Sequence, residues 1–284
     1  MDRLYSTQEF DDALAAFRRQ TQILERLTEA IVNHSDPVLR AAGPIAVAAE
    51  GSCKSVILLV EQDQIRDAFV TARTALLSII TACFILAEGP RAAERARRHA
   101  SQKTIRDLHR EVQTKDIRIV LSWSGTDQVD RLKAEFPELR VWLNEFERKS
   151  GKERIQWTEE NVMEQIEAIT RKYGQKIGSF LLMGIATIYR HASEIAHGTL
   201  FGELWFLGFT TPGDYPVTKS DLNSGPRKRA TGMLGALSFC VLTLVKVLSD
   251  EFGNPENLFT EADEAIRDYI SKIRPTGARG TERQ

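Results

Sequence analysis

The chain has 284 residues, of which 42% are hydrophobic and 27% are charged. This composition is typical of soluble globular proteins, and the length suffices for one large domain or two small ones. The net charge of −1 excludes a protein that coats nucleic acid over its whole surface, although a local basic strip is compatible with it.

Three lone cysteines, Cys53, Cys83 and Cys240, lie in apolar runs and lack the spacing of a metal site or a CxxC motif. We interpret them as buried, reduced side chains of a cytoplasmic protein. The N-terminal residues lack the features of a signal peptide. No motif indicates a zinc, calcium or nucleotide-cofactor site, so we expect neither a metal nor a cofactor.

Two apolar runs, residues 74–87 and 230–245, are shorter than the roughly 20 residues that a membrane-spanning helix needs. We therefore predict that they form buried central helices and that the protein has no membrane partner.

Helical periodicity dominates the chain, and no convincing strand pattern is present. The first helix is predicted to end near Asn33, a second starts at Pro37, and Gly43-Pro44 indicates a kink or break. Further helices are predicted over residues 45–61, 63–87, 90–113, 127–149, 158 onward, 175–197, 227–251 and 259–273.

The predicted fold is all-α, a helical bundle with additional N- and C-terminal helices. We expect four divisions, which are an N-terminal helix with a kinked connection, a helical core, an irregular loop, and C-terminal helices with a frayed tail. Their ranges are 1–44, 45–200, 201–226 and 227–284. The loop is rich in Gly, Pro, Asp and Asn and is long for a compact domain, which points to function or mobility.

Residues 189–198, YRHASEIAHG, end the helix predicted over 175–197. Arg190, Ser193 and His197 stand at offsets 0, 3 and 7 and so share one face, opposite the apolar face of the same helix. Gly198 follows at the position after a helix terminus that favours a left-handed backbone. The sequence therefore predicts an outward polar face beside a helix end.

An arginine and a histidine together suit RNA cleavage without a metal ion. A neutral imidazole accepts the proton of a 2′-hydroxyl, and a guanidinium holds the phosphate and offsets charge in the transition state. Seven helical residues rise about 10.5 Å, so convergence on one phosphate requires side chains that lean together or copies from two protomers. The ordinary alternative is an Arg190–Glu194 ion pair with His197 at the negative end of the helix dipole.

Two stretches together resemble an uncharacterised, mostly bacterial helical family that looks related to the HEPN superfamily. They are the Tyr189-Arg190-x-x-Ser193-x-x-x-His197-Gly198 helix end and the upstream helix QIRDAFVTARTALLSIITACFIL, residues 64–86. The resemblance covers about residues 45–200. It implies a HEPN-like, often dimeric helical core, with Arg190 and His197 as the catalytic pair of a metal-independent endoribonuclease and His191 as their polar neighbour. Several branches of the superfamily keep only scaffolding or binding roles.

Arg73 stands among apolar positions of the upstream helix, where an unpaired charge is costly. Glu61, Asp63 and Glu194 are candidate partners, and we expect a structural ion pair, most simply with Glu194. The alternatives are a contact with substrate and a side chain that extends to the surface.

A second basic feature is residues 91–110, where seven Lys and Arg face two acids. Six cations fall on one side of the predicted helix and form a candidate nucleic-acid-binding stripe, with a solvated helix face as the alternative. The stripe consists of Arg91, Arg95, Arg98, Lys103, Arg106 and Arg110.

These patterns lead us to expect a metal-independent HEPN-type endoribonuclease or RNA-binding effector of a bacterial defence or toxin system. Arg190 binds phosphate, His197 acts as general base or acid, and Ser193 orients one of them. The expected partners are RNA, a second copy of the chain, and an unidentified protein inhibitor or effector. The alternative is a non-catalytic helical interaction or scaffold protein.

Overall fold

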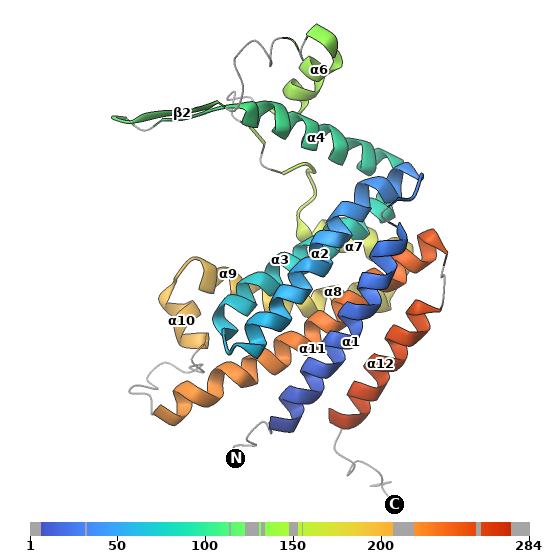
Figure 1. Cartoon of the computed structure of the whole chain (residues 1–284), viewed down its shortest axis with the longest axis vertical. Helices are drawn as coiled ribbons and strands as arrows, with labels where there is room; N and C mark the ends of the chain where they lie inside the picture. Colours follow the sequence, from blue (N-terminus) through green and yellow to red (C-terminus); the bar gives the residue numbers. More distant parts are fainter. Residues whose placement is uncertain are drawn as a thin grey trace, which may run out of the picture. The chain divides into compact units, whose positions relative to one another are not determined.

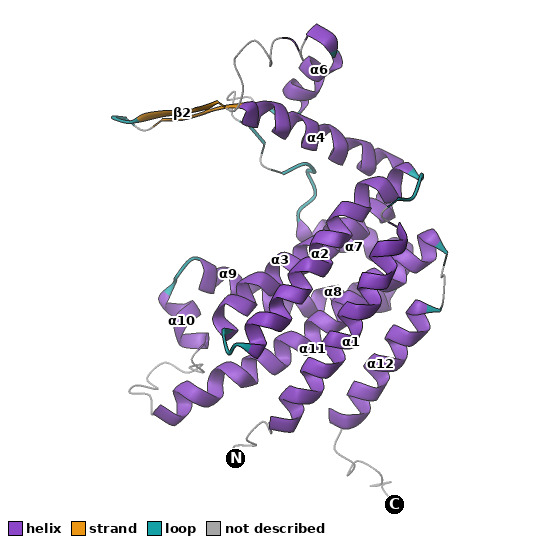
Figure 2. Cartoon of the chain, in the orientation of Figure 1, coloured by secondary structure: helices purple, strands orange, loops and turns teal. Residues whose placement is uncertain are grey.

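The computed structural model in Figure 1 is almost entirely helical, as the secondary-structure colouring of Figure 2 also shows. The predicted all-α class is therefore confirmed. The structure describes residues 7–31, 33–113, 115–122, 131, 134–147, 153–154, 156–206, 219–253 and 257–273.

The chain divides into two compact units. One comprises Met1–Ala87 and Val162–Gln284, and the other, Glu88–Asn161, is inserted between them in the sequence. The structure thus divides the chain differently from the expected continuous core of residues 45–200. Helical periodicity does not reveal the insertion because it continues through α4, the first helix of the inserted unit (Pro90–Leu108).

The larger unit contains a π-helical turn, η1, within a series of α-helices. Its elements are α1 (Thr7–Ile31), α2 (Pro37–Glu61), α3 (Ile65–Glu88), α7 (Val162–Tyr173), α8 (Gln175–Gly184), η1 (Ile185–Tyr189), α9 (Arg190–Ala196), α10 (Leu200–Phe206), α11 (Lys219–Phe252) and α12 (Leu258–Ile273).

Helix α11 is the centre of this unit and packs against α1, α2, α8, α10 and α12 (Figure 1). Its residues from Ala230 to Leu248 are apolar around most of the helix and are almost all buried. A helix that is apolar on all sides belongs in a core. The expectation that residues 230–245 form a buried central helix is confirmed.

Helix α2 begins where the sequence predicts but does not break at Gly43-Pro44. The Asp36 carboxylate accepts hydrogen bonds from the backbone N–H groups of Val38 (2.8 Å) and Leu39 (3.0 Å) and so caps the first turn. Pro44 lies inside the continuous helix on its exposed side, where the carbonyl that loses its donor can bond water. The predicted break was therefore wrong.

Helix α3 runs antiparallel to the series α7, α8 and η1. Near its start, the Arg73 guanidinium lies over the ring of Tyr189 in η1. In its middle, Leu76 lies against Gly184 in α8. At its end, the carbonyl of Leu86 accepts a hydrogen bond from Lys172 Nζ in α7 (2.7 Å). The two segments that carry the family resemblance are thus side by side.

The inserted unit contains the only strands among the described residues. After α4, the strands β1 (His109–Gln113) and β2 (Arg118–Ser122) form an antiparallel hairpin, and α6 (Glu138–Glu145) follows. The predictions of a helix to residue 113 and of no strands were wrong. In β2, Ile119 and Val120 are consecutive and both exposed, so the strand lacks the alternation of apolar and polar residues that would have predicted it.

Two further expectations lie partly outside the described residues. Of the helix predicted over 127–149, the structure gives α6 and short helical pieces around residues 131 and 134–135. Of the loop predicted over 201–226, residues 207–218 are not described, while its two ends are helical, in α10 and α11.

Candidate functional site at the end of helix α9

The C-terminus of α9 is closed as the sequence predicts. Gly198 adopts a left-handed φ of 62°. Its N–H donates to the Ile195 carbonyl (3.0 Å), and the N–H of Thr199 donates to the Glu194 carbonyl (3.2 Å). This pair of bonds is the Schellman arrangement, which fixes the residue before the glycine. The backbone of His197 is therefore held in a defined position.

A short helix that the sequence patterns did not predict, α10, follows this cap directly. Thr199 is its N-cap, because the Thr199 hydroxyl accepts a hydrogen bond from the N–H of Gly202 (3.0 Å). The same hydroxyl donates to the Glu194 carboxylate (2.7 Å). A Cβ at Gly202 would lie 2.6 Å from the backbone carbon of Glu194, so only glycine permits this approach of α10 to α9.

Arg66 of α3 contacts both α9 and α10. Arg66 donates from its Nη2 to the Ile195 carbonyl of α9 (3.2 Å) and to the Glu203 carboxylate of α10 (2.7 Å). Its Nε also donates to Glu203 (3.2 Å), so the ion pair engages two nitrogens. The hydrogen bonds that Arg66 donates to the Glu203 carboxylate raise the pKa of Arg66, which keeps the guanidinium charged. We call residues 190–206, held by Arg66, the α9–α10 corner.

The polar face of α9 points away from the core, as predicted. Arg190 and His197 are both exposed, and Ser193 is partly exposed between them. The alternative pair of Arg190 with Glu194 is not formed, because the Glu194 carboxylate bonds Thr199 instead. In the part of the chain that the structure describes, Arg190 has no ion pair, and its guanidinium lies 6.0 Å from the ring centroid of Phe201.

The π-helical turn η1 comes directly before Arg190. A π-turn inserts one residue into an α-helix and is frequent at functional sites, where it rotates the residues that follow. Here Ile188, Ala192 and Ile195 remain buried after the turn, and Arg190 and His197 remain outside. No sequence pattern announces the turn.

His191 has a structural environment different from that of the exposed pair. Its ring is partly buried and stacks on Trp205 of α10, with centroids 3.8 Å apart and planes 4° apart. Burial lowers the pKa of His191, and the nearby charges of Arg190 and Arg229 lower it further. The histidine is therefore neutral at neutral pH and helps to dock α10, which fits a packing role better than a chemical one.

The ion pair expected for Arg73 is not formed in the described part of the chain. Glu194 bonds Thr199, and the other two candidate carboxylates, Glu61 and Asp63, pair with Arg18 and Arg227. The Arg73 guanidinium lies instead 4.9 Å from the ring centroid of Tyr189.

The basic stripe faces acids of its own unit. Four of its six cations have carboxylate partners. The six cations do not all lie on one helix, because Arg110 belongs to β1. The pairs are Arg95–Glu159 (3.5 Å), Arg98–Glu145 (3.0 Å), Lys103–Glu153 (2.5 Å) and Arg106–Glu147 (3.8 Å). Arg91 is exposed, and the side chain of Arg110 is outside the described part. These pairs favour a structural role for the stripe.

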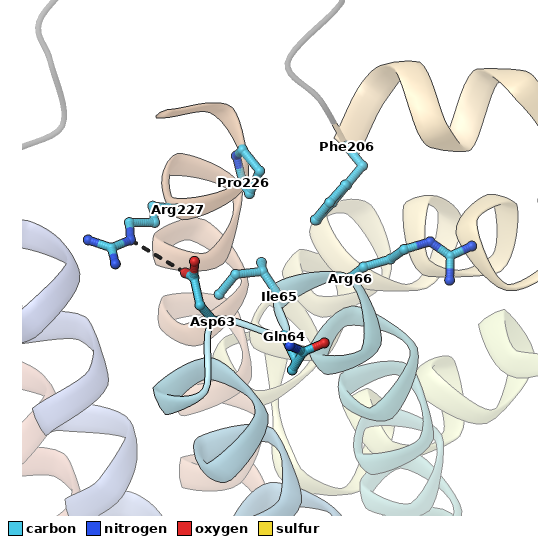
Figure 3. Close-up of a pocket in the computed structure, with 7 residues that line it drawn as sticks. All are labelled: Asp63, Gln64, Ile65, Arg66, Phe206, Pro226 and Arg227. Atoms are coloured by element: carbon cyan, nitrogen blue, oxygen red, sulfur yellow. Dashed lines mark ion pairs between the residues drawn. The ribbon is translucent and has the colours of Figure 1, made fainter. Parts of the chain in front are cut away.

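A separate cavity of about 440 Å³ lies at the turn between α2 and α3 (Figure 3). It is lined by Asp63, Gln64, Ile65, Arg66, Phe206, Pro226 and Arg227. Figure 3 shows Arg227 directed at Asp63, with which it pairs at 3.6 Å, and Arg66 directed away from both. Its lining includes neither Arg190 nor His197, so the cavity is not part of the exposed pair's site.

The three cysteines are buried, as expected, and burial raises the pKa of each thiol, that of Cys240 to about 12. A buried neutral thiol is no nucleophile. No group of three or more metal-ligating side chains gathers in the described residues.

Three helices are long and apolar enough to cross a membrane, namely Pro37–Glu61, Ile65–Glu88 and Gly225–Phe252. The apolar run 230–245 thus lies in a longer helix than the predicted 227–251, whereas the run 74–87 lies in a helix of about the predicted length. In the most apolar 18-residue stretch of each helix, the share that is buried within the protein is 39%, 61% and 83%, respectively.

The fold and the site define an all-α protein that exposes an arginine and a histidine on one helix face at the α9–α10 corner. The chain belongs to a family of unknown function, DUF5677, whose model matches residues 42–209. This match contains both α3 and the α9–α10 corner. No match was found among curated proteins or among solved structures.

Proposed function

We propose that the protein is a cytoplasmic, metal-independent endoribonuclease of HEPN type that acts as an effector in a toxin or phage-defence system. The observation that carries this proposal is the face of α9 on which Arg190 and His197 are both exposed, each without a carboxylate partner among the described residues. A guanidinium that is not neutralised internally is available to an external anion.

The chemistry requires only these two groups and the RNA itself. The imidazole of His197 accepts the proton of a ribose 2′-hydroxyl, and the 2′-oxygen attacks the adjacent phosphorus. The bond to the 5′-oxygen breaks, and that oxygen takes up a proton from water, so the products carry a 2′,3′-cyclic phosphate and a 5′-hydroxyl. Arg190 binds the phosphate oxygens and offsets their charge in the transition state. Ser193 orients one of the pair by hydrogen bonding.

An aromatic ring beside Arg190 supports a single-stranded substrate. Phe201 is 49% exposed, which is unusual for a phenylalanine, and its ring borders the Arg190 guanidinium. Exposed aromatic rings next to arginines stack the bases of single-stranded RNA. In this arrangement a base lies on Phe201 while its phosphate reaches Arg190.

A homodimer would bring an arginine and a histidine closer together than a single α9 helix does. Arg190 and His197 lie about 10.5 Å apart along the helix axis, and side chains on a helix lean toward its N-terminus. Two α9 faces packed antiparallel would bring His197 of each copy near Arg190 of the other. The small exposed residues Ser179 and Ala186, which precede Arg190 in α8 and η1, leave room for a second helix to approach.

A non-catalytic interaction protein is the second candidate, and the exposed apolar residues next to His197 favour it. Leu200 is 73% exposed and precedes Phe201 on α10. Consecutive exposed apolar residues mark protein-binding surfaces as well as RNA-binding ones. In this alternative the α9–α10 corner docks a protein, and Arg190 contributes charge only.

Expression in a bacterial host tests the proposal. We expect the wild type to slow growth and fragment cellular RNA, and His197→Ala and Arg190→Ala to abolish both effects. Arg40→Ala, which removes an exposed arginine from α2, is the matched control and should behave as the wild type. Because an inhibited effector could conceal activity in cells, the same variants are assayed as purified proteins on labelled RNA in EDTA. Intact RNA in both settings would leave the interaction protein as the better account.

A further inference from the structure

Arg73 has an environment that its expected structural role does not explain. Its side chain is partly buried, and its Nε atom is buried without a hydrogen-bond partner. A buried polar atom without a partner costs free energy. All three carboxylates that could have neutralised it are engaged elsewhere.

The two terminal nitrogens of Arg73 differ from Nε. They are neither buried without a partner nor hydrogen-bonded within the described part of the chain. They are therefore accessible to solvent and present free N–H donors. The guanidinium lies over the Tyr189 ring, and this contact restricts its orientation.

The position of Arg73 is next to the proposed active face. Tyr189 and Arg190 are consecutive, so their side chains are about 100° apart around the helix. Ser193 lies between them on the surface, because it is one turn after Tyr189 and about 60° from Arg190. The stacked guanidinium is thus at the edge of the face that carries Arg190 and His197.

We infer that Arg73 is a second phosphate-binding group, which binds a phosphate of single-stranded RNA next to the one bound by Arg190. This inference rests on the proposed function. A phosphate on Arg73 accepts hydrogen bonds from the exposed edge of a guanidinium held flat by Tyr189, a geometry suited to two parallel bonds. An arginine without a carboxylate partner in α3 is then explained by substrate binding, because its two terminal nitrogens, unlike the buried Nε, reach the phosphate.

The test is the salt dependence of RNA binding. A fluorescent single-stranded RNA with 2′-O-methyl groups at every position serves as probe, because it lacks the attacking hydroxyl. Each phosphate contact contributes about 0.7 to the slope of log K against log salt concentration. We expect Arg73→Met and Arg190→Met each to lower the slope by about that amount and to weaken binding about tenfold at low salt. Arg40→Met should change neither quantity.

Thermal unfolding separates this role from a structural one. Arg73→Met fills a similar volume and removes the unpartnered Nε, so we expect no loss of Tm although RNA binding weakens. Arg73→Gln provides the same test if the methionine variant does not fold. Arg73→Lys keeps the charge, so it should restore the slope while binding less tightly than the wild type.

The outcomes are distinct. If Arg190→Met lowers the slope and both Arg73 substitutions leave it unchanged, the inference is wrong and the proposed site stands. If Arg73→Met lowers Tm by several degrees without changing the slope, the arginine is structural. If the wild-type protein does not bind the probe, both the inference and the RNA site are refuted.

Discussion

Replacing Gly202 with alanine tests whether the α9–α10 corner is as tight as its geometry indicates. The added Cβ would lie 2.6 Å from the Glu194 carbonyl carbon and 2.7 Å from the Ile195 nitrogen. Both are backbone atoms that cannot rotate away. Ordinary contact begins near 3.4 Å, so α10 and α9 must separate by about 0.8 Å. This displacement would disturb the Thr199 cap and the stack of His191 on Trp205.

Overpacking of this kind costs about 1–3 kcal/mol, from which the helix propensity of alanine recovers about 0.5–1 kcal/mol. We expect Gly202→Ala to lower the free energy of unfolding by about 1–2 kcal/mol, measured by urea unfolding followed by circular dichroism. Gly51→Ala is the control. Gly51 is exposed in α2, and an added Cβ there would meet nothing within 4 Å, so the same substitution should stabilise by about 0.5–1 kcal/mol. Equal effects of the two substitutions would refute the tight corner.

Three further predictions concern charged and titrating groups. Arg66→Gln removes the ion pair with Glu203 and the hydrogen bond to the Ile195 carbonyl. Because the pair is partly exposed, we expect a loss of about 1 kcal/mol, with faster hydrogen exchange of the amides at residues 197–199. The lowered pKa of His191 favours its neutral form in the folded state, so its contribution to stability is present above pH 6.5 and is lost as the pH falls through the lowered pKa. His191→Phe should therefore reduce the fall in Tm between about pH 7.5 and pH 5.5, and an unchanged fall would contradict the assigned environment. Arg98→Met removes a cation already paired with Glu145, so it should leave the salt slope of RNA binding unchanged, whereas a lower slope would restore the basic stripe as an RNA site.

The sequence predicted those features of the fold that depend on local patterns. The apolar periodicity identified the long helices, Pro37 marked the start of α2, and Gly198 marked the end of α9. Features that depend on tertiary contacts were missed. The hairpin in the inserted unit has consecutive exposed apolar residues and so no strand period, and α2 continues through Pro44 because that residue faces outward.

The candidate site was predictable in its residues but not in its surroundings. The offsets of Arg190, Ser193 and His197 suffice to place all three on the outer face of the helix. The Arg66 contacts join residues 129 and 137 positions apart in the sequence, and no local pattern indicates such a pairing. One signal was present for α10, because Thr199 precedes a short run with an acid in its first turn, as a helix N-cap does.

The central claim is that His197 and Arg190 act together on the phosphodiester bond of RNA. Its most direct test is product analysis with a labelled oligonucleotide, incubated with the purified protein in EDTA, in parallel with the same oligonucleotide carrying 2′-deoxy sugars throughout. We predict that the RNA yields fragments with 2′,3′-cyclic phosphate and 5′-hydroxyl ends, that the deoxy oligonucleotide stays intact, and that either His197→Ala or Arg190→Ala abolishes cleavage. Cleavage that persists at wild-type rate in both variants would contradict the claim.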